Sequence, residues 1–250
     1  MEKIQVIVLA AGKGKRMNHE DIPKVLIEIK NKPIINYVLN AIEASNVCKT
    51  PVIVIGFQKE KVINKLGNKY VYIEQKEQLG TGHAVNVCKN FLKGKAENIL
   101  VLYGDHPSIT ESMVKNLAES HLKNNNILTL GTIKVDNFQD WKSVFYDYGR
   151  IIRDNKGEVS AILEKKDASL EQLKITEVNP SYFCFKASWL WNNIEKLKNK
   201  NSQKEYYLTD LLNLAFSQKQ KINAVLIDPK EGLGINTKKQ LDFVKNLLFK

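Results

Sequence analysis

The first candidate for chemistry is a basic glycine loop that directly follows the first apolar run of the sequence. Leu9–Met17 reads LAAGKGKRM. Its two glycines, Gly12 and Gly14, allow a tight turn that presents backbone N–H groups to an anion. Three cations lie beside them: Lys13, Lys15 and Arg16. The spacing is neither that of a P-loop nor that of the dinucleotide fingerprint. The loop therefore predicts phosphate binding, with a plain tight connection as the alternative.

Two further groups suit a phosphate site and a metal ion. Pro23 places Lys24 just past the glycine loop, where its ammonium can reach the same phosphates, although most single lysines are solvated surface groups. Asp105 lies in Tyr103–Pro107 (YGDHP), which ends another apolar run. A carboxylate there suits Mg²⁺, which takes one or two protein carboxylates together with substrate phosphates; an ordinary Gly-Asp turn is the alternative. His106 is a softer ligand and suits Mg²⁺ less well.

A third motif, Gln75–Ala84 (QKEQLGTGHA), suits recognition of a base. Glycines on both sides of Thr81, at a predicted strand-to-helix junction, allow close approach of a ligand to the N–H groups that open the helix. The Gln75 side-chain amide offers a donor and an acceptor, which can match a base edge. An ordinary capped turn explains the motif equally well. His83 alone is more typical of a structural hydrogen bond than of a catalytic base.

The elements that must position these groups alternate between strand and helix. Apolar runs predict strands at Ile4–Leu9, Val52–Ile55, Tyr70–Ile73 and Ile99–Tyr103. Helices are predicted after Pro33, from about Thr81 to Leu92, and after Thr110, which can cap the last of them. Strands buried on both faces and linked by helices indicate an α/β fold with a doubly wound, mostly parallel, Rossmann-like sheet. Ligands bind at the carboxyl ends of the strands in such sheets.

The second half changes character. Ile151–Leu163 predicts a β-hairpin that turns at Asp154–Gly157, and we interpret this hairpin as an insertion that adds a substrate wall to the sheet. A strand, two amphipathic helices, a strand and a closing helix are predicted after it: Tyr182–Phe185, Trp189–Leu197, Leu208–Ser217, Ile222–Ile227 and from about Thr237. Neither internal repeats nor the hexapeptide repeat of a β-helix occur in the sequence.

Composition narrows the class of protein. The formal charge of +11 and pI near 9.3 suit phosphorylated partners, but lysine-rich solvated faces explain them as well. No arginine-rich tract, zinc-finger spacing or RNA-binding motif favours nucleic acid. We expect neither a signal peptide nor a membrane span, although the basic, amphipathic closing helix can touch a membrane surface. Three scattered cysteines, Cys48, Cys88 and Cys184, indicate neither disulfides nor a zinc site and suit a reducing cytoplasm.

Together and in this order, the motifs resemble the sugar-nucleotidyltransferase family. Within this family, the chain resembles the pyrophosphorylase domain of the bacterial bifunctional N-acetylglucosamine-1-phosphate uridyltransferases. Matching segments run almost from end to end: LAAGKGKRM, PKVL, QLGTGHA, LYGDHP, YGRI, LEKKDAS, EVN, EYYLTD and GLGINTKKQL. The resemblance implies a cytoplasmic, Mg²⁺-dependent enzyme of cell-envelope precursor synthesis. It would transfer UMP from UTP to N-acetylglucosamine 1-phosphate and release pyrophosphate, without a nucleic-acid partner.

The resemblance also implies a role for individual residues. The UTP phosphates would be held by Gly12, Gly14, Arg16 and Lys24, and the uracil by Gln75, Gly80 and Thr81. The wider nucleotide-binding group adds Ala10, Ala11 and Gly104. Asp105 and Asn236 would hold the Mg²⁺, and Arg16, Lys24 and Asp105 would be catalytic. Four residues would face the sugar: Gly149, Glu164, Asn179 and Tyr207. As alternatives, Glu164 is a solvated charge at a strand end and Asn236 a turn former.

The fold expected from the resemblance is the nucleotide-diphospho-sugar transferase type, as one domain over residues 1–250. Its nucleotide-binding half spans about 1–135, and its sugar-binding half with the closing helix spans about 136–250. Three departures stand out. Pro180-Ser181 replaces the usual Thr-Gly after Asn179, and Asp136–Asp147 is a longer, aromatic stretch. The family's acetyltransferase β-helix has no counterpart in these residues, so the oligomeric state stays open, as does a separate acetyltransferase partner.

The chemistry expected from the residues agrees with this. A sugar phosphate is already an anionic nucleophile at neutral pH, so nucleotidyl transfer requires alignment and charge neutralisation more than a general base. Two alternatives remain. One is the same reaction with another sugar, polyol or choline phosphate, or another NTP. The other is a catalytically silent sensor of nucleotide sugars.

Overall fold

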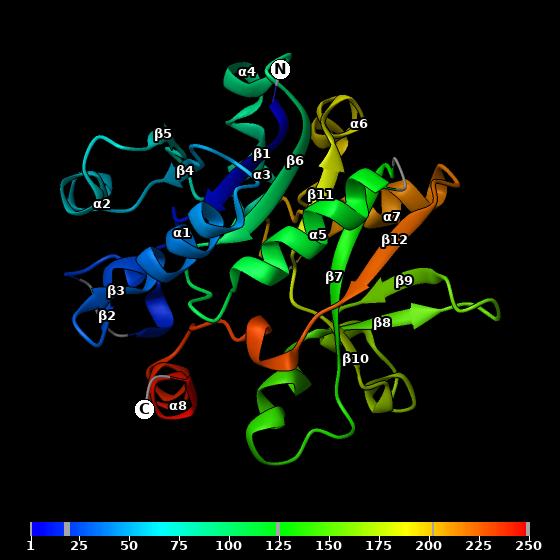
Figure 1. Cartoon of the computed structure of the whole chain (residues 1–250). Coiled ribbons are helices and arrows are strands. Elements are labelled where there is room, and N and C mark those ends of the chain that lie inside the picture. The colour runs from blue at the N-terminus through cyan, green and yellow to red at the C-terminus, as the bar shows by residue number, and fades with distance from the viewer. Residues whose placement is uncertain (1, 18–20, 124–125, 202, 249–250) are drawn as a thin grey trace.

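The computed structural model describes residues 2–17, 21–123, 126–201 and 203–248. Their strands form a ten-stranded sheet in the order β5-β4-β1-β6-β11-β7-β10-β8-β9, with β12 also paired to β7 (Figure 1). In that order the strands span Val71–Glu74, Val52–Ile55, Glu2–Leu9, Ala96–Tyr103, Phe183–Lys186, Leu128–Lys134, Glu177–Asn179, Gly149–Arg153 and Val159–Leu163, and β12 spans Ile222–Leu226. Two short strands, β2 (Glu28–Ile29) and β3 (Lys32–Pro33), pair separately.

Most of the central strands run in one direction. β5, β4, β1 and β6 pair in parallel, and β12 pairs in parallel with β7. β11 lies between β6 and β7 and is antiparallel to both. The mostly parallel α/β sheet is therefore confirmed, with β11 reversed near its centre and antiparallel pairs β7–β10, β10–β8 and β8–β9 toward one edge. Because β1 and β6 are parallel with Leu9 opposite Tyr103, the loops that follow the two strands leave the sheet at the same edge.

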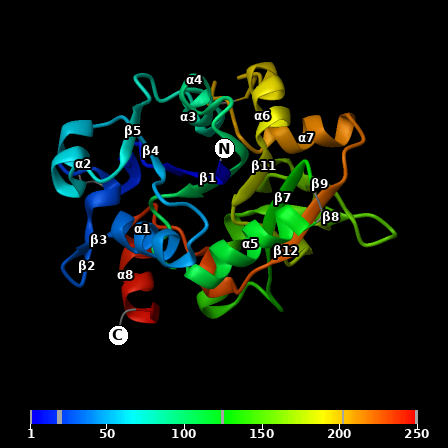
Figure 2. The same cartoon turned by 45° about the horizontal axis from the view of Figure 1, so that its top comes forward.

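Helices cover both faces of the sheet, as the alternation along β1 requires. Val6 and Val8 belong to the core beneath α1 (Ile34–Ser45) and α5 (Glu111–Lys123). Ile7 and Leu9 belong to the core on the opposite face of the sheet, against which four further helices pack. These are α3 (Thr81–Asn86), α4 (Lys89–Leu92), α6 (Ala187–Asn193) and α7 (Asp210–Ser217). Figure 2 shows the two layers on either side of the strands. The doubly wound arrangement is confirmed.

The first-half elements follow the prediction with several differences. The predicted helix from Thr81 to Leu92 is divided into α3 and α4 by a two-residue turn at Val87 and Cys88. β5 is shifted by one residue from the predicted Tyr70–Ile73. The helix α2 (Lys59–Leu66) and the strand β7 were not predicted. β7 is buried from Leu128 to Ile133, but its sequence, LTLGTIK, mixes threonine and glycine among the apolar residues. The Thr110 hydroxyl accepts a hydrogen bond from the Met113 amide (3.2 Å), as a cap of α5 should.

The hairpin of β8 and β9 is confirmed, and the aromatic stretch before it folds into a short helix. A 3₁₀ helix, Asp140–Asp147, leads into β8. Arg150 of β8 is fully buried and donates to the Tyr146 carbonyl (3.0 Å), while its guanidinium faces the rings of Phe138 and Tyr146 at 4.9 and 5.2 Å. Phe145 is fully buried as well. These contacts show that the rings of the stretch pack against β8.

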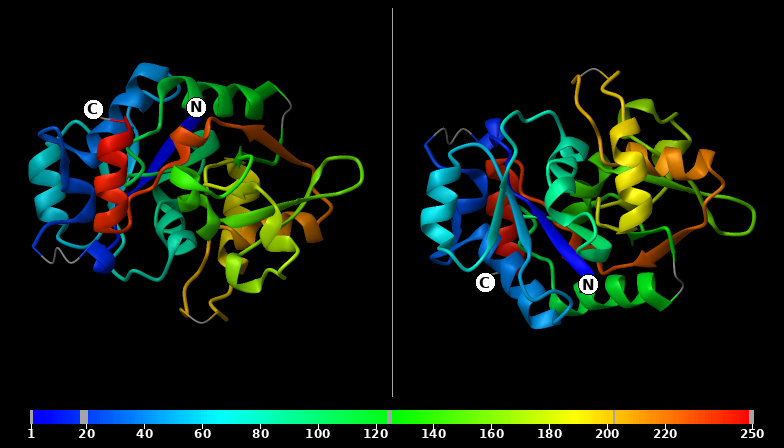
Figure 3. Two further views of the ribbon diagram at one scale, coloured as in Figure 1. Left: turned by 90° about the horizontal axis from the view of Figure 1, so that it is seen from below. Right: turned by 90° about the horizontal axis from the view of Figure 1, so that it is seen from above.

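The closing helix is α8, Lys238–Leu248, and the last two residues of its predicted range lie outside the described part of the chain. Leu241 and Val244 join the core under α1, so the apolar face of α8 docks on its own domain. The two views in Figure 3 place α8 on the side of the molecule that carries α1, β2 and β3. Within the described residues, none of the helices has the length and apolar character needed to cross a membrane.

Candidate active site

A cavity of about 800 Å³ opens at the carboxyl ends of β1, β5 and β6. Its lining combines the glycine loop, Lys24, the Gln75–Thr81 segment, the end of β6 and Asn236, which lies far along the chain. Of the sixteen residues predicted to act, eleven line it: Ala10, Ala11, Gly12, Gly14, Arg16, Lys24, Gln75, Gly80, Thr81, Asp105 and Asn236. The structure therefore brings the predicted phosphate, base and metal groups to one place.

The glycine loop is fixed at its base and free at its tip. The Ala10 amide donates to the Val54 carbonyl (2.9 Å), which ties the start of the loop to β4. Gly14 has a φ of +62°, and a Cβ at this position would lie 2.9 Å from Cβ of Lys24, so glycine lets the loop pack on that lysine. The space around the Gly12 α-carbon is open. The exposed tip can therefore turn its N–H groups toward an anion.

Lys24 joins the two residues expected to hold a metal. Its ammonium donates to Oδ2 of Asp105 and to Oδ1 of Asn236, the latter at 2.9 Å. The Lys24 and Asp105 side chains are each 12% exposed, so little solvent screens the pair. Burial raises the pKa of Asp105, but the charge of Lys24 and the hydrogen bond from Lys24 outweigh it, and the pKa lies below its usual value. Asp105 is therefore an ionised carboxylate.

The oxygens around this ammonium fit a hard divalent cation. A carboxylate and an amide oxygen converge on one positive charge, and Oδ1 of Asp105 is buried without a hydrogen-bond partner. Among the described residues, three or more His, Cys, Asp or Glu side chains nowhere gather into a metal cluster. A cation held here would thus take most of its ligands from water or substrate, as Mg²⁺ commonly does.

Asn236 reaches the site through a segment that is tied to Asp105 itself. The amide of Ile235 donates to the Asp105 carbonyl at 3.0 Å. The amides of Asn236 and Thr237 donate to Oε1 of Gln240, at 2.8 and 3.1 Å, at the start of α8. These backbone contacts leave the Asn236 side chain to face Lys24. The alternative, that Asn236 only forms a turn, does not account for the contact of its side chain with Lys24.

At the base end of the cavity, the two glycines beside Thr81 lie against another segment of this chain. A Cβ on Gly80 would lie 2.6 Å from the Tyr206 carbonyl oxygen, and one on Gly82 would lie 2.5 Å from the Leu197 side chain. The Tyr206 amide donates to the Leu79 carbonyl at 2.7 Å, and the Gly82 amide donates to the Tyr206 carbonyl at 2.8 Å. Both glycines therefore make room for this segment, and Gly80 also lines the cavity.

Gln75 and Thr81 are partly engaged by the protein. The Gln75 amide nitrogen contacts the Gly80 carbonyl (3.0 Å) and Nδ1 of His83 (3.1 Å), so its oxygen is the group left for a base. His83 thus has the structural contact expected of it. Thr81 Oγ1 accepts a hydrogen bond from the Leu208 amide at 2.9 Å. Gly104 does not line the cavity; its amide donates to the Leu9 carbonyl (2.9 Å), which joins the ends of β1 and β6.

The four residues expected to face a sugar lie outside the cavity lining but close to one another. Gly149 of β8 is the cross-strand partner of Asn179 of β10. Oε1 of Glu164 lies 3.7 Å from where a Cβ on Gly149 would be. Burial raises the pKa of Glu164, and burial together with the charges of Glu205 and Glu164 raises that of Tyr207. Because Glu164 is half-buried, the alternative of a fully solvated charge does not describe it.

Pro180 shapes the connection that follows Asn179. Oδ1 of Asn179 accepts a hydrogen bond from the Ser181 amide at 2.8 Å, and Ser181 has a φ of +69°. This left-handed backbone favours glycine, the residue usual at this place in the resembling family. Asn179 itself is extended in β10, as a residue before proline should be. Its side-chain oxygen is thus engaged by the turn.

Several lining residues were not predicted. Gln203 and Glu205 form a wall of the cavity, together with Lys76, Glu77 and Gln78 from the base motif. Tyr103 also faces the cavity, and burial raises the pKa of its phenol. Glu205 belongs to the EYYLTD motif, but the sequence does not show that it lines the cavity. Its position follows from the hydrogen bonds that join Tyr206 to Leu79 and Gly82.

Comparison with known proteins gives consistent matches. Residues 6–204 match a family described as MobA-like NTP transferase domain. The chain is 39% identical over 244 residues to Bifunctional protein GlmU of Geotalea daltonii, covering 96% of this chain and 51% of that protein. It is 40% identical over 243 residues to Bifunctional protein GlmU of Clostridium novyi, covering 97% and 51%. The chain thus spans about half the length of these relatives.

A solved structure from Bacillus anthracis, assigned as a glucose-1-phosphate thymidylyltransferase and determined in complex with sucrose, has the same fold. Its TM-score is 0.75 over 98% of this chain and 94% of that one. The sequence identity is 17%, so this likeness concerns the fold alone.

Proposed function

The chain belongs to the family of MobA-like NTP transferase domains and is a nucleotidyltransferase, and from this premise we propose that it transfers UMP from UTP to N-acetylglucosamine 1-phosphate. The products would be UDP-N-acetylglucosamine and pyrophosphate. One observation carries the proposal: the basic glycine loop, Lys24, Asp105 and Asn236 line a single cavity at the carboxyl ends of β1 and β6. Phosphates bound by the loop would lie beside Asp105 and Asn236, whose side-chain oxygens suit a metal.

In the proposed mechanism, the protein aligns two polyanions and neutralises their charge. The sugar phosphate has a second pKa near 6, so its oxygen attacks the α-phosphorus of UTP without a general base. Arg16 and the Gly12–Gly14 backbone would hold the phosphates of UTP, and Lys24 would stabilise the charge that develops during in-line transfer. Asp105 and Asn236 would hold Mg²⁺, which would supply further positive charge to the transferring phosphate. Pyrophosphate leaves without needing a proton.

Selection of uracil is proposed for the Gln75 end of the cavity. The oxygen of the Gln75 amide can accept the N3 hydrogen of uracil, since the amide nitrogen is already engaged. Cytosine carries no hydrogen at N3, so this contact would discriminate against CTP. Thr81 would hold the wall that closes over the base, through Leu208.

Selection of the sugar is proposed for the group Gly149, Glu164, Asn179 and Tyr207. Nδ2 of Asn179 and the Glu164 carboxylate can donate to and accept from sugar hydroxyl and amide groups. The engaged Oδ1 of Asn179 favours an acceptor group on the substrate, such as the carbonyl of an N-acetyl group. Another hexose, polyol or choline phosphate is the competing substrate.

Three buried cysteines without disulfides, Cys48, Cys88 and Cys184, support a cytoplasmic location.

The test is pyrophosphate release over a grid of nucleotides and phosphates. UTP, dTTP, CTP and GTP would each be combined with the 1-phosphates of N-acetylglucosamine, glucosamine, glucose and N-acetylgalactosamine, and with phosphocholine, in the presence of Mg²⁺. We expect the highest kcat/KM for UTP with N-acetylglucosamine 1-phosphate and loss of turnover with EDTA. A higher value for another pair would replace the proposed substrates. Binding of UDP-N-acetylglucosamine without any turnover would identify a sensor instead.

A further inference from the structure

The aromatic stretch between β7 and β8 ends two residues before Gly149, although none of its rings lines the cavity. Its rings form a connected cluster. Phe138 contacts Tyr146 edge to face, with 5.5 Å between the ring centroids, and Trp141 contacts Phe145 in the same way at 6.0 Å. Phe145 is fully buried, whereas Tyr146 is 38% exposed. Tyr146 therefore lies where the cluster meets solvent.

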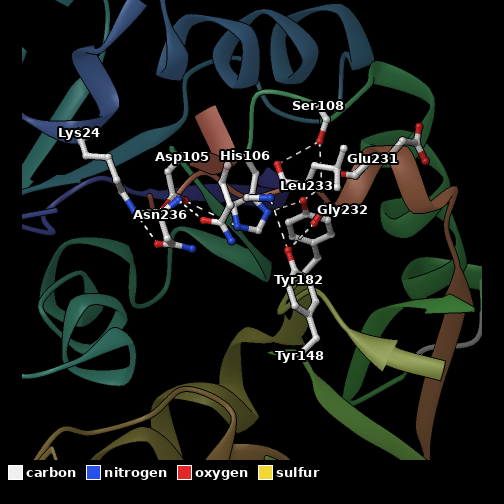
Figure 4. A network of polar contacts seen from close by, with 12 residues as sticks. Lys24, Asp105, His106, Ser108, Tyr148, Tyr182, Glu231, Gly232, Leu233 and Asn236 are labelled. Carbon is white, nitrogen blue, oxygen red and sulfur yellow. Dashed lines mark hydrogen bonds and ion pairs between the residues drawn. The ribbon is translucent and has the colours of Figure 1, made fainter. Parts of the chain in front are cut away.

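Two residues next to Gly149 in the chain anchor this cluster. Arg150 of β8 is fully buried, and its guanidinium donates to the carbonyls of Tyr146 (3.0 Å) and Tyr148. Cζ of Arg150 also lies 5.2 Å from the Tyr146 ring centroid, within the range of a cation–π contact. The Tyr148 hydroxyl donates to the Gly232 carbonyl at 2.9 Å (Figure 4). The cluster is therefore joined both to β8 and to the segment that precedes the expected metal ligand of the C-terminal part.

Tyr146 in turn contacts the first residue after Glu164. Nζ of Lys165 lies 4.5 Å from the Tyr146 ring centroid and 2.6 Å from Oδ1 of Asp147. The Lys165 and Asp147 side chains are 41% and 74% exposed, so each contact alone is weak. Together they favour one position of the ammonium. Because Lys165 directly follows Glu164, this position also restrains how the Glu164 side chain is directed.

The far end of the same loop, residues 165–174, is held by Arg150. Nε and Nη2 of Arg150 each lie 3.4 Å from the Leu173 carbonyl oxygen. Between the two ends, Leu170 is 82% exposed, so the tip of the loop stands in solvent. The position of the loop therefore depends mainly on the contacts near its two ends.

Glu164 links this loop to the residues expected to face the sugar. β9 ends at Leu163, which pairs with Arg150 of β8, so the backbone just before Glu164 is fixed by the sheet. Oε1 of Glu164 lies 3.7 Å from where a Cβ on Gly149 would be. The carboxylate thus follows a strand that fixes it on one side and precedes a loop that Tyr146 restrains on the other.

We propose that Tyr146 is a positioning residue for the sugar phosphate: its ring holds Lys165 and thereby keeps the Glu164 carboxylate beside Gly149, where a sugar hydroxyl or amide group can bind it. The proposal rests on the proposed function in one respect, that Glu164 faces the sugar. It also gives a role to the stretch Asp136–Asp147, which is longer than usual in the resembling family. Tyr146 contacts no substrate in this scheme and acts through the loop that follows Glu164.

The substitution Tyr146→Leu removes the aromatic ring and keeps an apolar side chain. Lys165 then loses one of its two contacts, so the loop should open more often. Tyr146→Phe keeps the ring and should behave as the wild type. The matched control is Tyr70→Leu, which removes a ring that also lies near an ammonium, Nζ of Lys69 at 5.7 Å from the centroid, but outside the cavity lining.

Hydrogen exchange followed by mass spectrometry tests the loop without any substrate. Peptides that cover residues 165–174 should exchange about fivefold faster in Tyr146→Leu, since loss of an exposed cation–π contact changes a local opening equilibrium by about that factor. The wild type, Tyr146→Phe and Tyr70→Leu should exchange alike in this loop.

Steady-state kinetics test the effect on the sugar phosphate. The KM for N-acetylglucosamine 1-phosphate should rise about fivefold in Tyr146→Leu, while kcat and the KM for UTP stay within about twofold of the wild type. A general structural defect would instead lower kcat or raise both KM values. Lys165→Met removes the ammonium from the other side of the contact, so it should give the same shift, and the double variant should add little to it.

Three results would overturn the proposal: unchanged exchange of the loop in Tyr146→Leu, faster exchange with an unchanged KM for the sugar phosphate, or a defect in Tyr146→Phe equal to that in Tyr146→Leu. If Tyr146→Leu does not fold, Lys165→Met decides by the same two measurements. Failure of the proposed function appears separately, in the wild type. If another acceptor phosphate has the higher kcat/KM, the proposed substrate is replaced, and Tyr146→Leu should raise the KM for that acceptor. If the wild type binds UDP-N-acetylglucosamine without turnover, the Kd for that ligand takes the place of KM.

Discussion

At the scale of single residues, the centre of the site is a contact among three side chains, Lys24, Asp105 and Asn236. The ammonium of Lys24 lies between Asp105 and Asn236, so this cation already neutralises the carboxylate in the protein alone. The same group lines the cavity beside the glycine loop that would hold the phosphates. Charge, rather than proton transfer, is therefore what substitutions here should affect.

Asp105→Asn should abolish most activity while leaving the fold intact. The amide keeps the shape of the side chain, and Lys24 keeps the Asn236 oxygen as an acceptor, so the unfolding midpoint should change little. Loss of the carboxylate removes the expected metal ligand, and kcat should fall by about 10²–10³. Asp136→Asn, which alters an exposed ion pair with Lys142, is the matched control. Wild-type turnover of Asp105→Asn in Mg²⁺ would show that the metal assignment is wrong.

A second residue, His121, should make stability depend on pH. It is 1% exposed and contacts Thr129 Oγ1 at 2.9 Å and Oδ1 of Asn98 at 3.1 Å. Burial, with a contribution from the charge of Lys186, lowers its pKa to about 4. The unfolded chain binds a proton near pH 6.5 and the folded protein does not, so stability is lost as pH falls from about 6.5 toward 4.

The loss attributable to His121 should reach up to about 3 kcal/mol, from a difference of about 2.5 pKa units. Denaturant unfolding at a series of pH values measures it. His121→Gln should be less stable at pH 7 but should show a flatter decline between pH 6.5 and 4. His83→Gln, outside this network, should keep the wild-type decline. An unchanged decline in His121→Gln would contradict the assignment.

At the scale of elements, the base end of the cavity is built by two segments that dock backbone to backbone. Residues 79–82 and 206–208 exchange hydrogen bonds through Leu79, Gly82 and Tyr206, and Thr81 adds a side-chain contact to Leu208. The cavity wall at Gln203 and Glu205 is positioned by this docking, so its integrity should control both stability and nucleotide binding.

Gly80→Ala should break this docking. Gly80 has a φ of +103°, and a Cβ would lie 2.6 Å from the Tyr206 carbonyl oxygen. The positive φ costs about 1–2 kcal/mol and the overlap about 1–3 kcal/mol, so the free energy of unfolding should fall by about 3 kcal/mol. Gly157→Ala is the control: its φ is +78° with open space around it, so only the first term applies. Equal losses in the two variants, measured with denaturant, would refute a docking role.

At the scale of the whole molecule, the strongly patterned elements were predictable and the long-range docking was not. The apolar patterns of β1, β4 and α1 each favour one type of secondary structure. The parallel pairing of β1 with β6 brings the glycine loop close to Asp105. β7 was missed because threonine and glycine dilute its pattern, although it is central. The helix from Thr81 was predicted too long because a local pattern does not reveal where the chain turns between α3 and α4.

The candidate site divides in the same way. Motifs that follow a strand directly, such as Gly12, Gly14 and Asp105, could be placed from the sequence because strand ends share an edge. The wall at Gln203 could not, since backbone contacts with Leu79 and Gly82 create it. The contact of Tyr146 with Lys165 was equally hidden, because neither side chain carries a local signal of the other.

The position of β11 between β6 and β7 has a consequence for how the protein is made. The sheet cannot close until Phe183–Lys186 has been synthesised, because this strand separates two strands that precede it in the chain. Lys24 and Asn236 are 212 residues apart, so their contact can form only after Asn236 has been synthesised. A nascent chain can fold its first parallel strands early, but it exposes the edge of β6 to other chains until β11 arrives. Premature termination before residue 186 should therefore yield aggregation-prone fragments rather than a smaller working enzyme.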